Sequence, residues 1–130
     1  MAAVKACGLG ATLSGLAAAW LWALIRGPAP TPEVTTASER RIPGILTRRC
    51  RNASPKNGTQ RHGIRVTTVP ATLLRLSSLL PFDELARAVH EADVRYGTRP
   101  EHIEAVLKRH PRAKGRQTLL AIARGDAPRS

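Results

Sequence analysis

The chain has 130 residues and a formal net charge of +12, from 21 Lys or Arg against nine Asp or Glu. This length suits one domain with a modest core, and with only 3% aromatic residues that core must consist of Leu, Val, Ile and Ala. Cys7 and Cys50 are too few for the disulfide framework of a small secreted protein. We interpret them as reduced thiols of a cytoplasmic protein.

Residues 6–25 carry no charge, so this stretch fits a membrane anchor, an export signal or a core helix. Its large apolar residues recur at intervals of 4, 3, 4 and 4, which places them on one face of a helix. A one-sided stripe of this kind is typical of a helix that packs on a core. The stripe consists of Leu9, Leu13, Leu16, Trp20 and Leu24.

The expected ends of this helix favour the core interpretation. Ser14 is a good N-cap, Gly27 suits a left-handed C-terminal cap, and Pro28 blocks continuation. A helix over residues 15–26 would span roughly 18 Å, less than the roughly 30 Å hydrocarbon core of a bilayer. The nearest small-x-small site is followed by proline, which disfavours a signal peptide. We therefore expect a cytoplasmic protein, with a membrane anchor through residues 6–25 as the alternative.

Three short strands are predicted next, at residues 33–36 (EVTT), 44–48 (GILTR) and 61–68 (RHGIRVTT). Residues 52–60 are rich in turn formers and are predicted to be a polar loop. Because the connections are short, we expect antiparallel pairing.

Alternation within the third strand predicts the direction of its side chains. Ile64 and Val66 would face the core, while Arg61 and Arg65 would share the opposite face and reach solvent. Arg49 would join them if the register of the sheet permits.

A bundle of three to four helices is predicted after the sheet. The first has Pro70 in its first turn, is apolar nearly all round and ends at Pro81. The second covers residues 82–96 and is closed by Gly97. Thr98 and Glu101 form a capping box for the third helix. The fourth is expected around residues 116–124, with Gly125 as its stop.

The expected fold class is therefore α+β. A small sheet of about three antiparallel strands would be flanked by an N-terminal helix and the C-terminal helical bundle. We expect one domain over residues 1–130, made of an apolar helical segment (1–27), a basic sheet region (33–68) and a helical region (70–125).

The stretch from Arg40 to Arg65 holds eight basic residues and no acid, which predicts affinity for phosphate polyanions. No aromatic residue lies within it to stack on bases, so we expect contacts to phosphates alone. The candidate polyanion-binding residues are Arg40, Arg41, Arg48, Arg49, Arg51, Lys56, Arg61 and Arg65.

Signatures of enzymes are missing from the sequence. There is no Gly-rich phosphate loop, nucleophile elbow or close cysteine pair, and the four histidines never fall four residues apart. Glu91 is expected to pair with Arg87 and Arg95, and Glu104 with Lys108, as surface ion pairs. We predict no catalytic residues, no cofactor and no metal site.

Several stretches resemble one family. The segment "ACGLGATLSGLAAAWLWALIRGPAPTPEVT" and the later "GIRVTT", "LPFDELARA" and "HEADVRY" are together similar to the middle domain of actinobacterial AbiEi-like antitoxins from type IV toxin–antitoxin systems. Many members of this family carry a further domain related to very-short-patch-repair endonucleases. The resemblance extends over nearly the whole chain.

The sequence also departs from the family pattern. Members begin with a winged-helix domain, and many end in the nuclease-like domain; neither is present here, so we expect a truncated member. Gly15-Leu16-Ala17 stands where His-Arg-Ser is usual, and Arg75 where Asp is frequent. If those polar residues form a site in relatives, this chain lacks it.

The resemblance implies a non-enzymatic regulatory or binding module. Such antitoxins bind promoter DNA and counter a nucleotidyltransferase toxin, so nucleic acid and a cognate toxin are the expected partners, and a membrane is not. Two alternatives stay open: a small basic protein anchored by residues 6–25, and a decayed gene remnant without activity.

Overall fold

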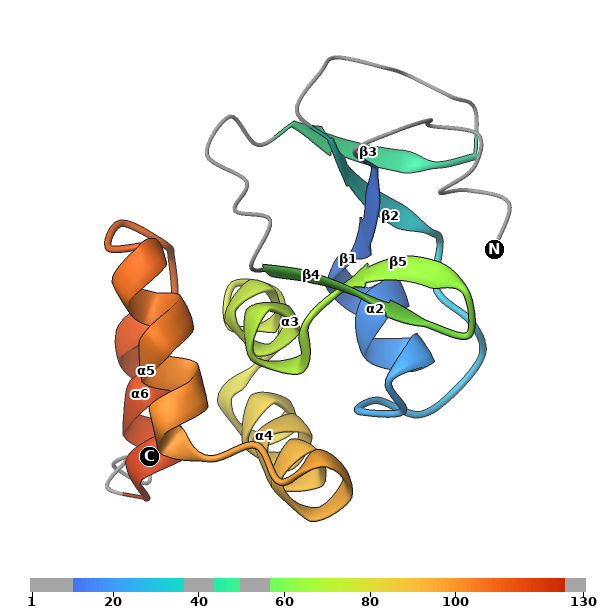
Figure 1. Ribbon diagram of the computed structural model, residues 1–130. Helices are drawn as coiled ribbons and strands as arrows, with labels where there is room; N and C mark the ends of the chain where they lie inside the picture. The colour runs from blue at the N-terminus through green and yellow to red at the C-terminus, as the bar shows by residue number, and fades with distance from the viewer. Residues whose placement is uncertain (1–10, 37–43, 50–56, 126–130) are drawn as a thin grey trace. The chain divides into compact units, whose positions relative to one another are not determined.

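The computed structural model describes residues 11–36, 44–49 and 57–125, whose helices and strands are drawn in Figure 1. The chain divides into two compact units, Met1–Thr68 and Val69–Ser130. This division falls where the sequence predicts the junction between the sheet region and the helical region. The α+β fold class is confirmed.

The first unit contains a mixed sheet with the strand order β3-β2-β1-β5-β4. The pairs β1–β2 and β4–β5 are antiparallel, whereas β1–β5 and β2–β3 are parallel. The strands are β1 (Thr12–Ser14), β2 (Glu33–Thr36), β3 (Leu46–Arg49), β4 (Gly58–Arg61) and β5 (Ile64–Thr67).

The prediction of about three antiparallel strands is wrong in strand number and in pairing. Strand β1 lies inside the segment predicted to be helical, and β4 covers the end of the predicted polar loop. Both are short, and their sequences have no strong strand pattern of their own. They are strands because β1 pairs with two neighbours and β4 pairs with β5.

Residues 58–67 form a hairpin of β4 and β5, so the single strand predicted over residues 61–68 is wrong. His62 and Gly63 connect β4 to β5, with φ angles of +52° and +75°. Positive φ at both central residues is the geometry of a type I′ turn, whose twist matches that of the paired strands. Arg61 therefore ends one strand and Arg65 lies on the next.

Helix α2 (Gly15–Leu21) follows β1 directly and packs against one face of the sheet (Figure 1). Its Ala17 and Ala18 pack with Leu13 of β1 and Val66 of β5 in a buried cluster. The small alanine side chains allow the helix to lie close to the sheet. This is the core of the first unit.

Helix α2 ends five residues before the predicted end at Arg26. Ala23 adopts a left-handed conformation with φ of +61°. The backbone N–H of Leu24 donates to Ala19 O at 2.8 Å, and that of Ala23 donates to Trp20 O at 3.0 Å. These two bonds form a Schellman motif, which terminates the helix. Gly27, the predicted cap, lies beyond this point.

Within the described residues, the helices are all too short or too polar to cross a membrane.

The described residues of the second unit form four helices, which are labelled in Figure 1. They are α3 (Val69–Leu76), α4 (Phe82–Tyr96), α5 (Pro100–Arg109) and α6 (Arg116–Arg124). Helix α3 contacts each of the other three, and α6 contacts both α4 and α5. The core is formed by apolar side chains of all four helices, among them Leu73, Leu76, Leu85, Ala88, Ile103, Val106 and Leu119.

Most helix limits in this unit agree with the sequence. The limits of α4 and α6 are as predicted, and Gly97 ends α4 with φ of +64°. Helix α3 is shorter than predicted, because the chain turns after Leu76.

The predicted capping box of Thr98 and Glu101 is wrong by one residue. Arg99 is the N-cap of α5, and its backbone N–H donates to Nδ1 of His102 at 2.9 Å. An imidazole nitrogen thus accepts the bond that a Glu carboxylate accepts in the usual motif.

Surface ion pairs partly follow the predicted i, i+4 pattern. Arg95 Nε lies 2.8 Å from Glu91 Oε2. That hydrogen bond, together with the charge of Glu91, raises the pKa of Arg95. Glu104 pairs with Arg124 of α6 rather than with Lys108, so this ion pair joins two helices.

Candidate functional site

The predicted polyanion-binding residues that the structure describes lie on three different strands of the sheet. Arg48 and Arg49 lie on β3 and Arg61 lies on β4, which are the two edge strands. Four strand spacings separate these strands, a distance of about 19 Å. Arg65 lies on β5. The remaining four candidates lie outside the described residues: Arg40, Arg41, Arg51 and Lys56.

Arg61 belongs to the packing of the first unit. It pairs with Ile64 across the hairpin, so it lies on the face that α2 covers. Its Nε donates to Leu21 O at 3.1 Å, and its guanidinium carbon lies 4.8 Å from the centroid of the Trp22 ring. The cation–π contact and the hydrogen bond attach β4 to the end of α2.

Arg65 lies on the other face of the sheet. It is opposite Gln60 in the register, and its Nε donates to Thr12 Oγ1 at 3.2 Å. The prediction that Arg61 and Arg65 share a face is therefore wrong. A single strand would place residues 61 and 65 on one side, but the turn at His62 and Gly63 places them on opposite sides.

A buried polar cluster lies on the same face as Arg65. Thr35 Oγ1 donates to Ser14 Oγ at 2.7 Å, and Ser14 Oγ donates to Glu33 Oε2 at 2.9 Å. Gly15 has φ of +64°, and a Cβ there would lie 2.6 Å from the same carboxylate oxygen. Ser14 is the N-cap residue of α2, as the sequence predicts, but its hydroxyl bonds to Glu33 instead of to a backbone N–H of the helix.

This polar cluster stabilises the fold and is not a catalytic site. Ser14 is 2% exposed and Glu33 is 7% exposed, so a substrate in solvent does not reach the hydroxyl. The hydrogen bonds join β1 to β2 at the start of α2. Across the described part of the chain, no group of three or more His, Cys, Asp or Glu side chains could hold a metal ion.

The second unit contains a basic segment that the sequence interpretation missed. Residues 108–116 (KRHPRAKGR) hold five Lys or Arg and no acid, and they form the end of α5, the connection to α6 and the first residue of α6. We call this segment the basic loop. Counting charges in short windows would have found it, because its density of basic residues exceeds that of the predicted stretch from Arg40 to Arg65.

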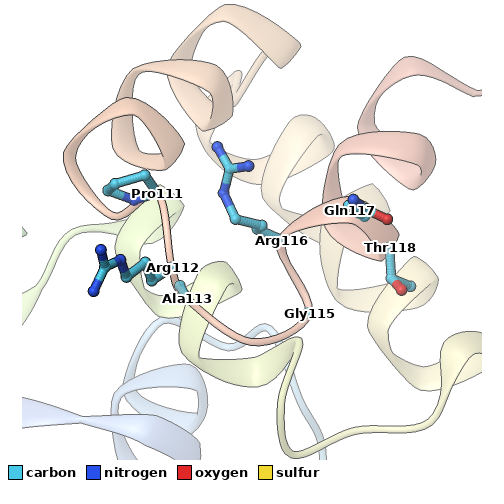
Figure 2. Close-up of a pocket in the computed structure, with 7 residues that line it drawn as sticks. All are labelled: Pro111, Arg112, Ala113, Gly115, Arg116, Gln117 and Thr118. Carbon is cyan, nitrogen blue, oxygen red and sulfur yellow. The ribbon is translucent and has the colours of Figure 1, made fainter.

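A groove of about 440 Å³ lies beside the basic loop. Figure 2 shows the side chains of Arg112 and Arg116 pointing in different directions. That of Arg116 points toward α5, and that of Arg112 points away from it. The groove is lined by Pro111, Arg112, Ala113, Gly115, Arg116, Gln117 and Thr118.

Two arginines of the basic loop form hydrogen bonds with the backbone of α5. Arg116 Nη2 donates to Leu107 O at 3.3 Å, and Arg109 Nη1 donates to Ala105 O at 3.4 Å. Both acceptors are carbonyls in the last turn of α5, where positive charge is favourable. The Nε of Arg116 is buried without a hydrogen-bond partner among the described residues. We therefore infer that Arg116 and Arg109 stabilise the C-terminal end of α5 through these hydrogen bonds.

The remaining three cations of the basic loop face solvent. Lys108, Arg112 and Lys114 are exposed, and the described residues offer their side chains no hydrogen bond or ion pair. Three cations within seven residues form a local concentration of positive charge that attracts anions. This is the strongest candidate site among the described residues.

The chain matches no family model, no curated protein and no solved structure. The similarity to AbiEi-like antitoxins therefore stays a prediction from the residues.

Proposed function

We propose that this chain is a non-enzymatic binding module that holds nucleic acid by its phosphates through the basic loop. The observation that carries the proposal is a set of three exposed cations whose side chains make no hydrogen bond or ion pair with the described residues: Lys108, Arg112 and Lys114. Their charge is available to a ligand, whereas that of Arg109 and Arg116 is directed to the carbonyls of α5. A net charge of +12 adds a long-range attraction for polyanions.

Binding at this loop should not depend on base sequence. Base edges are read by a helix or strand that enters a groove of the duplex, and single-stranded bases stack on aromatic side chains. The basic loop contains no Phe, Tyr or Trp. Phosphate contacts position a protein on nucleic acid without reading the sequence.

The biological role that we propose follows the resemblance. An AbiEi-like antitoxin acts on its promoter DNA and on a nucleotidyltransferase toxin, so the module would serve in autoregulation or toxin neutralisation. Of these two roles, the proposed phosphate binding by the basic loop bears on the first, where it would add affinity for DNA without selecting the promoter sequence.

A salt titration of a labelled random-sequence duplex tests the proposal. Three phosphate contacts give a slope of log K against log salt of about −2.7. The double variant Arg112→Ala/Lys114→Ala should reduce the slope to about −0.9 and weaken binding at least about tenfold at 50 mM salt.

The matched control removes two charges elsewhere in the same unit. Arg87 and Arg95 are exposed residues of α4, and the variant Arg87→Ala/Arg95→Ala has the same net charge as the loop variant. We expect its slope to stay near that of the unaltered protein. Equal losses in both variants would show that net charge alone acts, and would overturn the assignment to the basic loop.

A further inference from the structure

The residue that follows α3 contacts the basic loop directly. The Ser77 backbone N–H donates to Leu73 O at 3.0 Å, so Ser77 continues the last turn of the helix. Its hydroxyl lies within hydrogen-bond distance of two carbonyl oxygens, that of Leu74 and, at 3.1 Å, that of Lys114. The hydroxyl has one proton, so it can donate either to the carbonyl of its own helix or to that of the loop.

Gly115 allows the loop to come this close to α3. Its φ is +79°, and a Cβ there would lie 2.5 Å from Ser77 Oγ and 2.6 Å from Ser77 O. The second of these atoms belongs to the backbone and cannot rotate away. The next residues begin α6, because Leu119 N–H donates to Gly115 O at 3.0 Å.

We propose that Ser77 is a positioning residue of the phosphate-binding loop, an inference that rests on the proposed function. Ser77 fixes the backbone at Lys114, two residues from Arg112, and does not itself contact the ligand. Cations on a mobile loop lose conformational entropy when a ligand orders them, which weakens binding. Because Ser77 already holds the loop before a ligand binds, less conformational entropy is lost on binding.

Ser78 provides the matched control. Its hydroxyl donates to Arg75 O at 2.9 Å and accepts from Arg75 Nη1 at 3.4 Å, so its hydrogen bonds stay within one turn. The variants Ser77→Ala and Ser78→Ala therefore remove the same hydroxyl from adjacent positions, and only the first removes a contact with the basic loop.

Two measurements on the full chain test the role of Ser77. The first is the rate of trypsin cleavage after Arg112 and Lys114, together with amide hydrogen exchange in the loop. The second is the affinity for the random-sequence duplex and its salt slope. Both are made well below the melting temperature of each variant, so that a loss of global stability does not imitate local opening.

We expect Ser77→Ala to open the loop, since one lost hydrogen bond shifts an equilibrium by about two- to tenfold. Loop cleavage and exchange should accelerate by that factor, and duplex affinity should fall by a similar factor. The salt slope should not change, because the number of phosphate contacts is the same. Ser78→Ala should behave as the unaltered protein in each measurement.

The outcomes separate this inference from the proposed function. Unchanged cleavage and exchange in Ser77→Ala would show that the residue does not hold the loop. Faster cleavage with unchanged duplex affinity would show that holding the loop does not aid binding. If the unaltered chain binds no duplex, the proposed function fails, whereas the cleavage arm still reports on the contact of Ser77 with the loop.

Discussion

The role that the sequence predicts for Arg61 differs from the role that the structure shows. In the sequence it belongs to a run of basic residues that predicts a solvent-facing polyanion surface. In the structure its guanidinium stacks on Trp22 and its Nε bonds to Leu21 O. A planar guanidinium can make both contacts at once, which the ammonium group of lysine cannot. The residue is therefore a link between β4 and α2.

We predict that Arg61→Ala destabilises the first unit by about 1–2 kcal/mol, through loss of the cation–π contact and the hydrogen bond. Tryptophan fluorescence during urea unfolding measures the change. Arg26 is an exposed arginine of the same unit, and Arg26→Ala should change stability by less than about 0.5 kcal/mol. An equal effect of both substitutions would mean that the contacts of Arg61 contribute nothing beyond charge.

Glu33 shows why part of the polar cluster could not be predicted. Its neighbours in sequence indicate only a short strand, and β2 has the predicted bounds. The partner of its carboxylate, Ser14, is 19 residues away, and the register that brings the two together depends on β1. Since β1 lacks a local pattern, the hydrogen bond could not be foreseen from the residues.

At the scale of elements, the local signals at the two ends of α4 were reliable, whereas the pairing of the strands could not be predicted. The limits of α4 follow from Pro81 before it and Gly97 after it, which act within one turn of the helix. Strand β4 depends instead on its pairing with β5, and the turn that creates the pair consists of His62 and Gly63. A positive φ at a histidine is uncommon, so the sequence offers a weak turn signal there.

The end of α2 depends on a residue that is unfavourable for its conformation. Ala23 occupies the left-handed position of the Schellman motif with φ of +61°, where a Cβ costs roughly 1–2 kcal/mol. The motif holds because its two hydrogen bonds are made and because Leu24, the residue that follows, is 3% exposed. Packing of Leu24 thus overrides the local preference of alanine.

Ala23→Gly should therefore stabilise the first unit by about 1 kcal/mol, because glycine adopts positive φ without a steric penalty. Ala18 lies inside the same helix, and Ala18→Gly should instead destabilise by at least about 1 kcal/mol. Thermal unfolding followed by circular dichroism compares the two variants. The same substitution should have opposite signs at positions five residues apart, and a destabilised Ala23→Gly would contradict the assigned cap.

At the scale of the whole molecule, the proposed function depends on which positive charges are exposed. The net charge and the resemblance were available from the sequence, but the separation of basic residues into paired and exposed sets was not. Arg112 and Arg116 have the same chemistry and lie four positions apart. Only the structure shows that one donates to a carbonyl of α5 while the other lies in solvent. Among the residues that the structure describes, the basic loop is therefore the stronger candidate site, while Arg40, Arg41, Arg51 and Lys56 of the predicted stretch lie outside them.

The whole-molecule prediction concerns selectivity among nucleic acids. The contacts proposed for Lys108, Arg112 and Lys114 are to phosphates, which every duplex presents alike. Two 20-base-pair duplexes of unrelated sequence should compete for the protein with affinities within about twofold of each other, at equal salt. A single strand of the same length should not bind more tightly than the duplex, because the basic loop has no aromatic side chain on which bases could stack. Competition measured by fluorescence anisotropy decides between the outcomes. A preference of one sequence by a factor of a hundred would require base readout, and would show that residues outside the basic loop contribute to recognition.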